Sequence, residues 1–487
     1  MAEIRLLERV TASDLFLLLW DDYGWSTDIG GLAILDGTSL LDEDGGVRLD
    51  AVRRHLEPRM HLVPRFRQLL YRPRLGLGWP LWIDAPSFDL AEHIHVRALA
   101  APGDQDQLLQ TCQQLARRPF DPARPRWELW LLPGLPDHRV GAFLKLHHVL
   151  ADGPAAMAAF GALLDRTADA PVDGAPPWTP TPTPSTGELF RDNLRRRRRE
   201  LGHGWSGLVH PSRTLRLARR AWPAWREVLT EKPAPRTSLN RPVGPERRLT
   251  IVRGRLDPMK HVAHVHHATV NDVVLTAVAG GLRQLLASRS EDVQGLVQRA
   301  MVTISHHEAR PGEAQGNTPG WMMVPLPVGE PDPLRRLTLI TAETSARKHK
   351  VRPEAGSGIF RFVVGQRIWY RLFPRQRSVN LVVSNVPGPP MRLYLAGAPL
   401  LEVFPLLPPM GNLTLVVAAM SYAGQLNFTA AADQDSCPDV EVFARGVRSA
   451  LDDLAQPVLG AGTGGRAGAT EPVPPTDASA TSRRSPR

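Results

Sequence analysis

The chain has 487 residues, with 59 Lys and Arg against 49 Asp and Glu, which gives a formal net charge of +10. The 43% hydrophobic content excludes wholesale disorder, and the length predicts two or three structural units. Two cysteines, Cys112 and Cys437, exclude a disulfide scaffold and a cysteine-rich zinc module and fit a reducing compartment. The basic excess indicates nucleic acid, a membrane surface or a phosphate-bearing partner, without choosing among them.

The first 20 residues contain only one short apolar run, Leu15–Trp20. This run is shorter than the core of a signal peptide, and no stretch of the chain approaches the roughly 18–20 apolar residues that span a bilayer. We therefore expect a cytoplasmic protein, which leaves peripheral contact with a membrane open.

Residues 1–170 are predicted to form a mixed α/β lobe. Its expected elements, from the periodicity of apolar residues and the capping and Pro signals, are a helix capped at 11–14, a strand at 30–35, a helix at 108–115, a strand at 140–146 and a helix at 154–164.

Residues 171–245 are predicted to connect this lobe to a second one, because 171–185 are Pro-rich and 186–235 are Arg-rich. Residues 246–458 return to a mixed pattern, and 459–487 lack large apolar residues and are expected to be disordered. The elements expected in the second lobe are strands at 248–255, 301–305 and 380–384, helices at 270–288 and 439–454, and a hairpin of 413–419 with 426–431.

The sharpest chemical signal is Lys145–Gly153, in which a strand runs into His147 and His148 and then into Asp152 and Gly153. A histidine at the end of a strand is held by the scaffold yet open on one side, as a general base must be to meet a substrate hydroxyl. Asp152 can brace the loop or fix an imidazole tautomer, and Gly153 permits the turn. The alternative is that the two histidines are ordinary polar residues.

Two further histidine pairs, at 266–267 and 306–307, lack the Asp-Gly turn. The first follows His261 and His264 in a helical stretch, where we expect a solvated helix face. A metal site there is the alternative, although no carboxylate or cysteine lies close by in sequence. We expect neither a metal nor another cofactor.

The spacing HHxxxDG resembles the signature of the CoA-dependent acyltransferase superfamily, and the surrounding sequence resembles its bacterial wax ester synthase/diacylglycerol acyltransferase branch. The resemblance spans about residues 10–455 in the family's order. The matching stretches are Ser13-Asp14, Gly30-Gly31, Val63–Phe66, Leu75–Gly78, Arg118–Asp121, Arg124–Glu128, Thr269–Val273, Gly316-Asn317, Val324–Pro327 and Ser384–Pro389. Arg126 departs from the family, which usually has Leu at this position.

This resemblance implies an α/β (α+β) fold of two chloramphenicol-acetyltransferase-like lobes of mixed sheet and helices, with an active-site tunnel between them. His148 would be the general base that deprotonates the acceptor hydroxyl for attack on the thioester of acyl-CoA, without a covalent intermediate. His147, Asp152 and Gly153 would shape the loop.

Four residues of the second lobe are candidates for substrate or oxyanion contacts: Asn271, Asp272, Ser384 and Asn385. Asn271-Asp272 either provides a polar group near the oxyanion or acyl chain or caps the helix that it precedes. Ser384-Asn385 either lines the tunnel or makes the turn before Pro387.

The basic excess is concentrated in residues 191–226, which contain 11 Arg and two acids and so carry nine of the ten net charges. Residues 215–229 place Trp222 and Trp225 on one helical face, although Pro223 would kink this helix. Such a segment suits an anionic membrane or lipid-droplet surface, or it packs between the lobes with its arginines solvated. A contact of some arginines with CoA phosphate is a third possibility, and no nucleic-acid-binding module is recognised.

The leading hypothesis is a peripherally associated O-acyltransferase that moves a long-chain acyl group from acyl-CoA to diacylglycerol, to a long-chain alcohol, or to both. One alternative is acylation of a specialised metabolite or a carrier-bound substrate on the same fold. Another is a non-catalytic lipid-binding protein, and a histidine-metal hydrolase is a more distant one.

Overall fold

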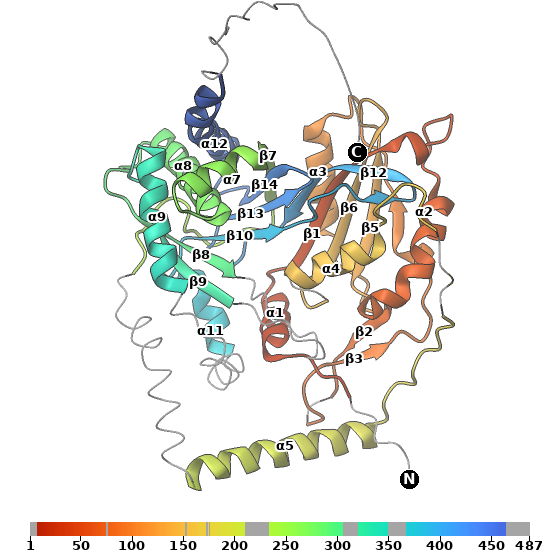
Figure 1. Cartoon of the computed structure of the whole chain (residues 1–487). Coiled ribbons are helices and arrows are strands. Elements are labelled where there is room, and N and C mark those ends of the chain that lie inside the picture. The colour runs from red at the N-terminus through yellow and green to blue at the C-terminus, as the bar shows by residue number, and fades with distance from the viewer. Residues whose placement is uncertain are drawn as a thin grey trace, which may run out of the picture.

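The computed structural model describes residues 7–74, 76–150, 153–171, 174, 176–209, 233–304, 320–348 and 367–463. Two six-stranded sheets lie side by side with helices packed around them (Figure 1). The mixed α/β class and the two lobes expected from the sequence are therefore confirmed. Among the described helices, none is both long and apolar enough to cross a membrane.

The first sheet mixes antiparallel and parallel strands. Its order is β11 (Tyr394–Leu395), β12 (Ala398–Leu406), β1 (Asp28–Asp36), β6 (Arg139–His147), β5 (Trp127–Pro133) and β4 (Ile94–Val96). Strands β1 and β6 pair antiparallel over their whole length, with Asp28 opposite His147. A separate hairpin joins β2 (Gln68–Tyr71) and β3 (Leu81–Asp84). The register places the start of β1 beside the histidine pair.

The helices of this lobe follow local sequence signals. They are α1 (Ala12–Asp22), α2 (Leu49–Leu56), α3 (Gln105–Arg117) and α4 (Gly153–Leu163), with 3₁₀ turns η1 (Gly37–Ser39), η2 (Glu57–Leu62), η3 (Pro64–Arg67) and η4 (Leu90–Glu92). Helix α1 begins with the predicted cap, because the Thr11 hydroxyl accepts from the Asp14 N–H at 3.1 Å and the Asp14 carboxylate accepts from the Thr11 N–H at 3.0 Å. The cap fixes the start of the helix whose last turn carries Asp21.

The second sheet contains the predicted hairpin. Its order is β7 (Arg247–Arg255), β14 (Gln425–Asp433), β13 (Leu415–Tyr422), β10 (Leu381–Pro387), β8 (Gln298–Ile304) and β9 (Gly320–Leu326). Strand β10 runs parallel to both β13 and β8. Because β10 lies inside the sheet and continues to Pro387, Ser384 and Asn385 have fixed positions within the strand, and the alternative that they make the turn is wrong.

Helices pack on this sheet around one long buried helix. They are α7 (Leu256–Val265), α8 (Val270–Ser288), α9 (Pro333–Lys348), α11 (Arg367–Leu372), η6 (Phe373–Arg375) and α12 (Val440–Thr463). Helix α8 has the predicted bounds and is buried on most of its surface. Gly281 allows α12 to approach, since a Cβ there would lie 2.7 Å from Val447 Cγ2. Helix α12 continues into the stretch 459–487 that was expected to be disordered, and the rest of that stretch lies outside the described residues.

The two lobes share strands and core. Strand β12 comes late in the chain, yet it pairs antiparallel with β1 in the first sheet, an exchange that the sequence patterns did not predict. Phe404 of β12 is fully buried in a cluster that includes Leu32 of β1 and Ile251 of β7. Met420 and Tyr422 of β13 likewise belong to the core of the first lobe. The lobes are therefore joined by two apolar clusters that contain residues of both sheets, and not by the connector alone.

The connector contains a helix, α5 (Thr186–Val209), that lies along one end of the molecule (Figure 1). Leu189 is buried with Leu7, Leu81 and Ile83, and Asp192 forms an ion pair with Arg9 at 2.8 Å. The first half of α5 is thus attached to the first lobe. The helical face predicted at 215–229, with Trp222, Trp225 and Pro223, lies outside the described residues.

Candidate active site

The histidine pair is positioned by backbone hydrogen bonds from both sides. His147 ends β6, and its N–H donates to the Arg126 carbonyl at 3.0 Å. The His148 N–H donates to the Thr27 carbonyl at 3.3 Å, and the Leu150 N–H returns to the His147 carbonyl at 2.9 Å. The loop therefore turns sharply at a fixed place beside the start of β1.

The His147 side chain is buried and has hydrogen-bond partners at both ring nitrogens. It is 2% exposed, and its Nδ1 accepts from the Val149 N–H at 3.2 Å. Its Nε2 lies 2.5 Å from Asp21 Oδ2 and 3.3 Å from Thr27 Oγ1. Because Nδ1 is an acceptor, we infer that Nε2 carries the hydrogen and donates a hydrogen bond to the Asp21 carboxylate. These bonds tie the His147 ring to α1, to the start of β1 and to the loop, and the supporting role implied by the family resemblance stays a prediction.

Asp21, in the last turn of α1, contacts both the histidine loop and the residue before β1. Its Oδ1 accepts from both the N–H and the hydroxyl of Thr27, each at 3.1 Å. Burial alone would raise the pKa of the Asp21 carboxyl, but the hydrogen bond and charge of His147 and the Thr27 bonds outweigh burial and lower this pKa. Asp21 is thus held as a carboxylate. Asp21 was not predicted from the sequence, because a contact between residues 126 positions apart leaves no local pattern.

Arg126, the departure from the family pattern, lies against the same carboxylate. Its Nη1 is 3.6 Å from Asp21 Oδ2, while its carbonyl holds the His147 N–H. Burial lowers the pKa of Arg126, and the charge of Asp21 opposes that shift. The arginine therefore makes an ion pair that a leucine at this position could not make.

Lys145 is a second buried charge in this region, with 1% of its surface exposed. Its Nζ lies 3.4 Å from Asp28 Oδ2, donates to the Arg118 carbonyl and sits 4.1 Å from the centre of the Phe120 ring. Burial raises the pKa of the Asp28 carboxyl, and Lys145 partly offsets the rise. Lys145 thus anchors the Arg118–Asp121 stretch to β6.

His148 is half-buried at the turn, and Gly153 is the first residue of α4. Asp152 lies outside the described residues, so its predicted role in supporting the loop stays a prediction. The role of His148 as general base likewise stays a prediction. The described geometry adds Asp21 as a carboxylate that fixes its neighbour, His147.

Two of the four residues proposed in the second lobe for substrate or oxyanion contacts are hydrogen-bonded to each other. The Asn385 Nδ2 donates to the Asn271 Oδ1 at 3.5 Å, which joins β10 to the first turn of α8. Ser384 Oγ lies 3.0 Å from Thr303 Oγ1 on β8. Val386 packs against the hydrophobic cluster that contains Leu146, Val149 and Leu150, so Asn385 stands beside the lobe that carries the histidine loop.

Asp272 has a different environment and is the N3 residue of the capping box of α8, whose N-cap is Thr269. It is 1% exposed, and its Oδ2 accepts from the Thr269 N–H and hydroxyl, each at 2.8 Å. Its Oδ1 accepts from the Thr344 hydroxyl at 2.7 Å. The capping alternative raised in the sequence analysis therefore describes Asp272, whereas Asn271 beside it is half-buried.

The other histidine pair that falls in the described part of the chain lies at and just beyond the end of α7. His261, His264, His266 and His267 are all exposed, as expected for a solvated face. Among the described residues, no cluster of three or more metal-ligating side chains occurs. The pair at 306–307 lies outside the described residues.

The two mixed sheets and the helices packed on them form the CoA-dependent acyltransferase fold. Residues 10–274 match the wax ester synthase/diacylglycerol acyltransferase catalytic domain, and residues 315–455 match the C-terminal domain of the same family. The chain therefore belongs to the wax ester synthase/diacylglycerol acyltransferase family. The resemblance seen in the sequence is confirmed.

Individual proteins of known name or structure are also similar to the chain. A probable diacylglycerol O-acyltransferase from Mycobacterium tuberculosis is 30% identical over 444 residues, which cover 88% of this chain and 91% of that protein. The solved wax ester synthase/diacylglycerol acyltransferase of Marinobacter aquaeolei VT8 superposes with a TM-score of 0.64 at 23% identity and covers 93% of this chain and 100% of that one. The starter condensation domain of rhizomide synthetase, solved with C8-CoA and Leu-SNAC, gives a TM-score of 0.58 at 12% identity over 92% and 94% of the two chains. At these identities the two solved structures show the shared fold.

Proposed function

We propose that the chain transfers a long-chain acyl group from acyl-CoA to the hydroxyl of diacylglycerol, of a fatty alcohol, or of both. The observation that carries this proposal is the histidine loop, fixed through His147 and Asp21 beside the junction of the two lobes. Family membership and the names of the mycobacterial relatives support the reaction type.

In the proposed mechanism, His148 takes the proton of the acceptor hydroxyl while the oxygen attacks the thioester carbonyl carbon. The carbonyl electrons move onto its oxygen and form a tetrahedral oxyanion. This intermediate collapses, the C–S bond breaks, and the CoA sulfur takes the proton from His148. One ester and one CoA thiol result, without a covalent enzyme intermediate. Asp21 and His147 act only by holding the loop.

Asn271 is proposed to stabilise the oxyanion. Its Oδ1 accepts from Asn385, and its amide nitrogen makes no hydrogen bond within the described residues. That nitrogen can donate to an oxygen that becomes negative in the transition state, where such a donor has most effect. Asn385 would orient Asn271, and Ser384 would hold β10 against β8 through Thr303.

We further propose that α5 brings the protein to an anionic membrane or lipid-droplet surface. Phe190 and Leu194 are 56% and 38% exposed, and Arg191 and Arg195 beside them are also exposed. Exposed apolar side chains next to cations suit a lipid interface. The buried Leu189 lies on another side of the same helix, which packs on the first lobe. Helix α5 can therefore contact both the first lobe and a lipid surface.

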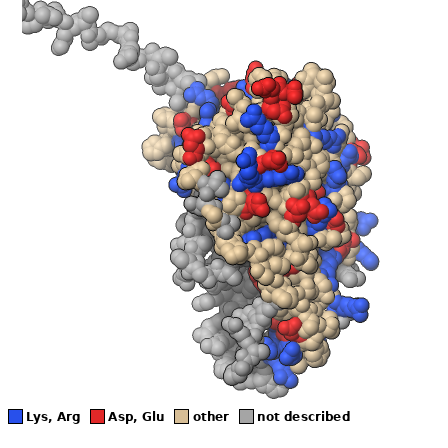
Figure 2. All heavy atoms as spheres, turned by 90° about the vertical axis from the view of Figure 1, so that its right-hand side faces the viewer, with Lys and Arg blue, Asp and Glu red and all other residues tan. Residues whose placement is uncertain are grey.

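On the first-lobe face shown in Figure 2, acidic and basic residues are interspersed over the upper part. The exposed ion pairs of the first lobe include Arg124 with Glu92 at 2.9 Å and Arg72 with Asp22 at 2.8 Å. Membrane contact is therefore proposed through α5 rather than through this face.

The test is a thiol-release screen of the purified protein that crosses acyl-CoA chain lengths with dioleoylglycerol, hexadecanol and small alcohols, with the ester product identified by mass. Release of thiol with matching triacylglycerol or wax ester supports the proposal. Release only with small or carrier-bound acceptors would instead favour a specialised-metabolite acyltransferase. Absence of release with every acceptor would favour a lipid-binding protein.

A further inference from the structure

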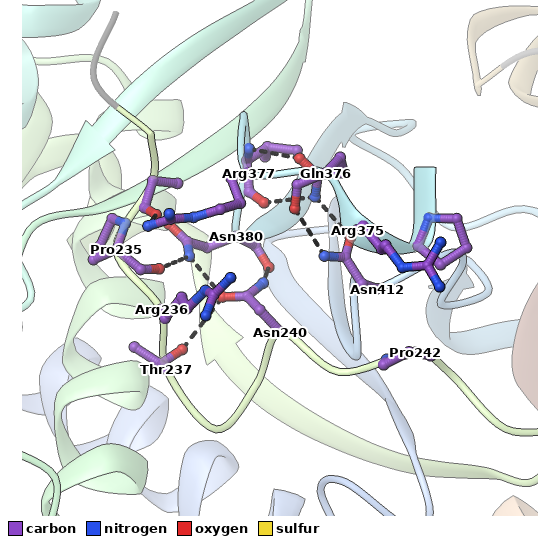
Figure 3. Close-up of a pocket in the computed structure, with 13 residues that line it drawn as sticks. Pro235, Arg236, Thr237, Asn240, Pro242, Arg375, Gln376, Arg377, Asn380 and Asn412 are labelled. Atoms are coloured by element: carbon purple, nitrogen blue, oxygen red, sulfur yellow. Dashed lines mark hydrogen bonds between the residues drawn. The ribbon is translucent and has the colours of Figure 1, made fainter. Parts of the chain in front are cut away.

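A cavity of about 380 Å³ opens in the second lobe at the amino end of β10 (Figure 3). One wall is the segment 234–242 that leads to β7, and another is the segment 374–380 that leads into β10. Asn412, from the turn before β13, completes it. The cavity is distant from the proposed chemistry, because the five residues from Asn380 to Asn385 along β10 span roughly 16 Å.

The floor of this cavity is a network of carboxamides. Asn380 Nδ2 donates to Asn240 Oδ1 at 2.7 Å and to the Pro235 carbonyl at 2.8 Å. Gln376 Nε2 donates to Asn412 Oδ1 at 2.8 Å, and Asn412 Nδ2 donates back to the Gln376 carbonyl at 2.9 Å. Asn380 and Asn412 are almost completely buried. These bonds fix both wall segments, so the side chains on them project from a rigid frame.

The rim of the cavity is strongly cationic. Arg236, Arg375 and Arg377 line it, and no Asp or Glu does. Within the described residues, none of the three forms an ion pair, and the one hydrogen bond from these guanidiniums is a long one from Arg377 Nη2 to the Ala234 carbonyl at 3.4 Å. Arg299 adds a neighbouring positive charge, because its Nη1 donates to the Ser378 carbonyl at 2.9 Å. Several like charges gathered in one concavity attract an anion.

The kind of anion follows from the donors. A guanidinium presents two parallel N–H groups that match two oxygens of a phosphate, and bidentate pairs of this type are strong and directional. The lining contains prolines but no aromatic ring on which a nucleobase could stack. The chemistry of the cavity therefore suits a phosphate group rather than a base.

We propose that this cavity is a phosphate-binding site, which takes a phosphate monoester carried either by a water-soluble nucleotide or by a lipid headgroup. It stands apart from the histidine loop, and the inference does not depend on the proposed acyl transfer. Arg236 on the segment 234–242 and Arg375 on the segment 374–380 supply the principal contacts, and Arg377, on the same segment as Arg375, completes them.

The test compares full-length wild-type protein with an Arg236→Gln/Arg375→Gln variant. The matched control is Arg445→Gln/Arg448→Gln, which removes the same charge from exposed positions of α12. Calorimetric titration with inorganic phosphate and with adenosine 3′,5′-bisphosphate probes soluble phosphates. Co-sedimentation with phosphatidylcholine vesicles, with and without phosphatidic acid, probes lipid phosphate. Circular dichroism checks that each variant is folded, as expected for exposed positions.

A soluble phosphate that binds saturably to wild type and to the control, and at least about tenfold more weakly to the pocket variant, supports a nucleotide-type site. Loss of phosphatidic-acid-dependent sedimentation in the pocket variant alone supports a lipid headgroup site. The proposal is overturned if no phosphate binds in either arm, if the pocket variant binds as well as wild type, or if the control loses as much binding as the pocket variant.

Discussion

Asp21→Asn is the substitution that most directly probes the support beneath the histidine loop. It keeps the shape of the side chain and removes its charge. An asparagine can offer its oxygen to His147 Nε2, but its NH₂ then faces the Thr27 N–H, which loses the acceptor that it has at 3.1 Å. Arg126 loses its counter-charge at 3.6 Å.

The expected loss of stability is about 2–4 kcal/mol. A hydrogen bond to a charged group contributes about 1.5–3 kcal/mol net against about 0.5–1.5 kcal/mol for a neutral one, and a buried donor without a partner costs about 1–3 kcal/mol. The turnover number should fall roughly 10- to 100-fold with KM little changed, because His148 would be displaced rather than removed. Urea unfolding and thiol-release kinetics measure the two effects.

The adjacent residue provides a matched control. Asp22 makes an exposed pair with Arg72 at 2.8 Å, so Asp22→Asn should cost less than about 1 kcal/mol and leave turnover unchanged. Equal effects at the two positions, or wild-type stability and turnover for Asp21→Asn, would refute the assigned role of Asp21.

The pH dependence of stability gives a second readout. Because the pKa of Asp21 is lower in the folded than in the unfolded protein, its ionised form stabilises the fold above the unfolded pKa near roughly 4. This contribution is lost as the pH falls through the folded pKa. Wild type should therefore lose its stability advantage over Asp21→Asn in acid, and a constant difference down to acid pH would contradict the pairing.

Three further predictions concern the second lobe. Asn271→Ala should lower turnover about 10²-fold through loss of an oxyanion donor while the unfolding midpoint in urea changes little, and unchanged turnover would remove Asn271 from the mechanism. Asp272→Ala should lower the free energy of unfolding by about 1–3 kcal/mol, since it removes the N3 half of the capping box of α8 and the acceptor of Thr344, and a fully stable variant would contradict that role. Gly281→Ala should lower the free energy of unfolding by about 1 kcal/mol or more, because its Cβ would lie 2.7 Å from Val447 and 2.8 Å from Phe443. The control Gly161→Ala, with open space on α4, should leave the melting temperature unchanged or raise it. A calorimetric melting temperature that falls for Gly161→Ala but not for Gly281→Ala would contradict the packing of α8 on α12.

Local patterns predicted much of this fold. The cap at Thr11, the bounds of α8 and the β13–β14 hairpin each depend on residues close together in sequence, and the structure has all three. The pairing of β12 with β1 depends on residues that are far apart, and a strand pattern does not state which sheet a strand joins. The sequence around Phe404 does not indicate which of the two lobes buries this side chain.

In the candidate site too, the features set by neighbouring residues were predicted, and those set by distant residues were not. His147 and His148 were found from their motif, and the alternative offered for Asn271-Asp272 describes Asp272 as a helix cap. Asp21 was missed, because nothing in the sequence near α1 distinguishes it from Asp22 beside it. The Arg126–Asp21 contact could not be predicted either, although the departure from leucine at this position was the signal that something there had changed.

The measurement that tests the central claim most directly is the turnover number of His148→Ala in the thiol-release assay with a long-chain acyl-CoA and dioleoylglycerol or hexadecanol. The reference variant is His264→Ala, at an exposed position on α7. The account predicts a fall of about 10²- to 10⁴-fold for His148→Ala and no change for His264→Ala. A folded His148→Ala protein that turns over at the wild-type rate would contradict the account.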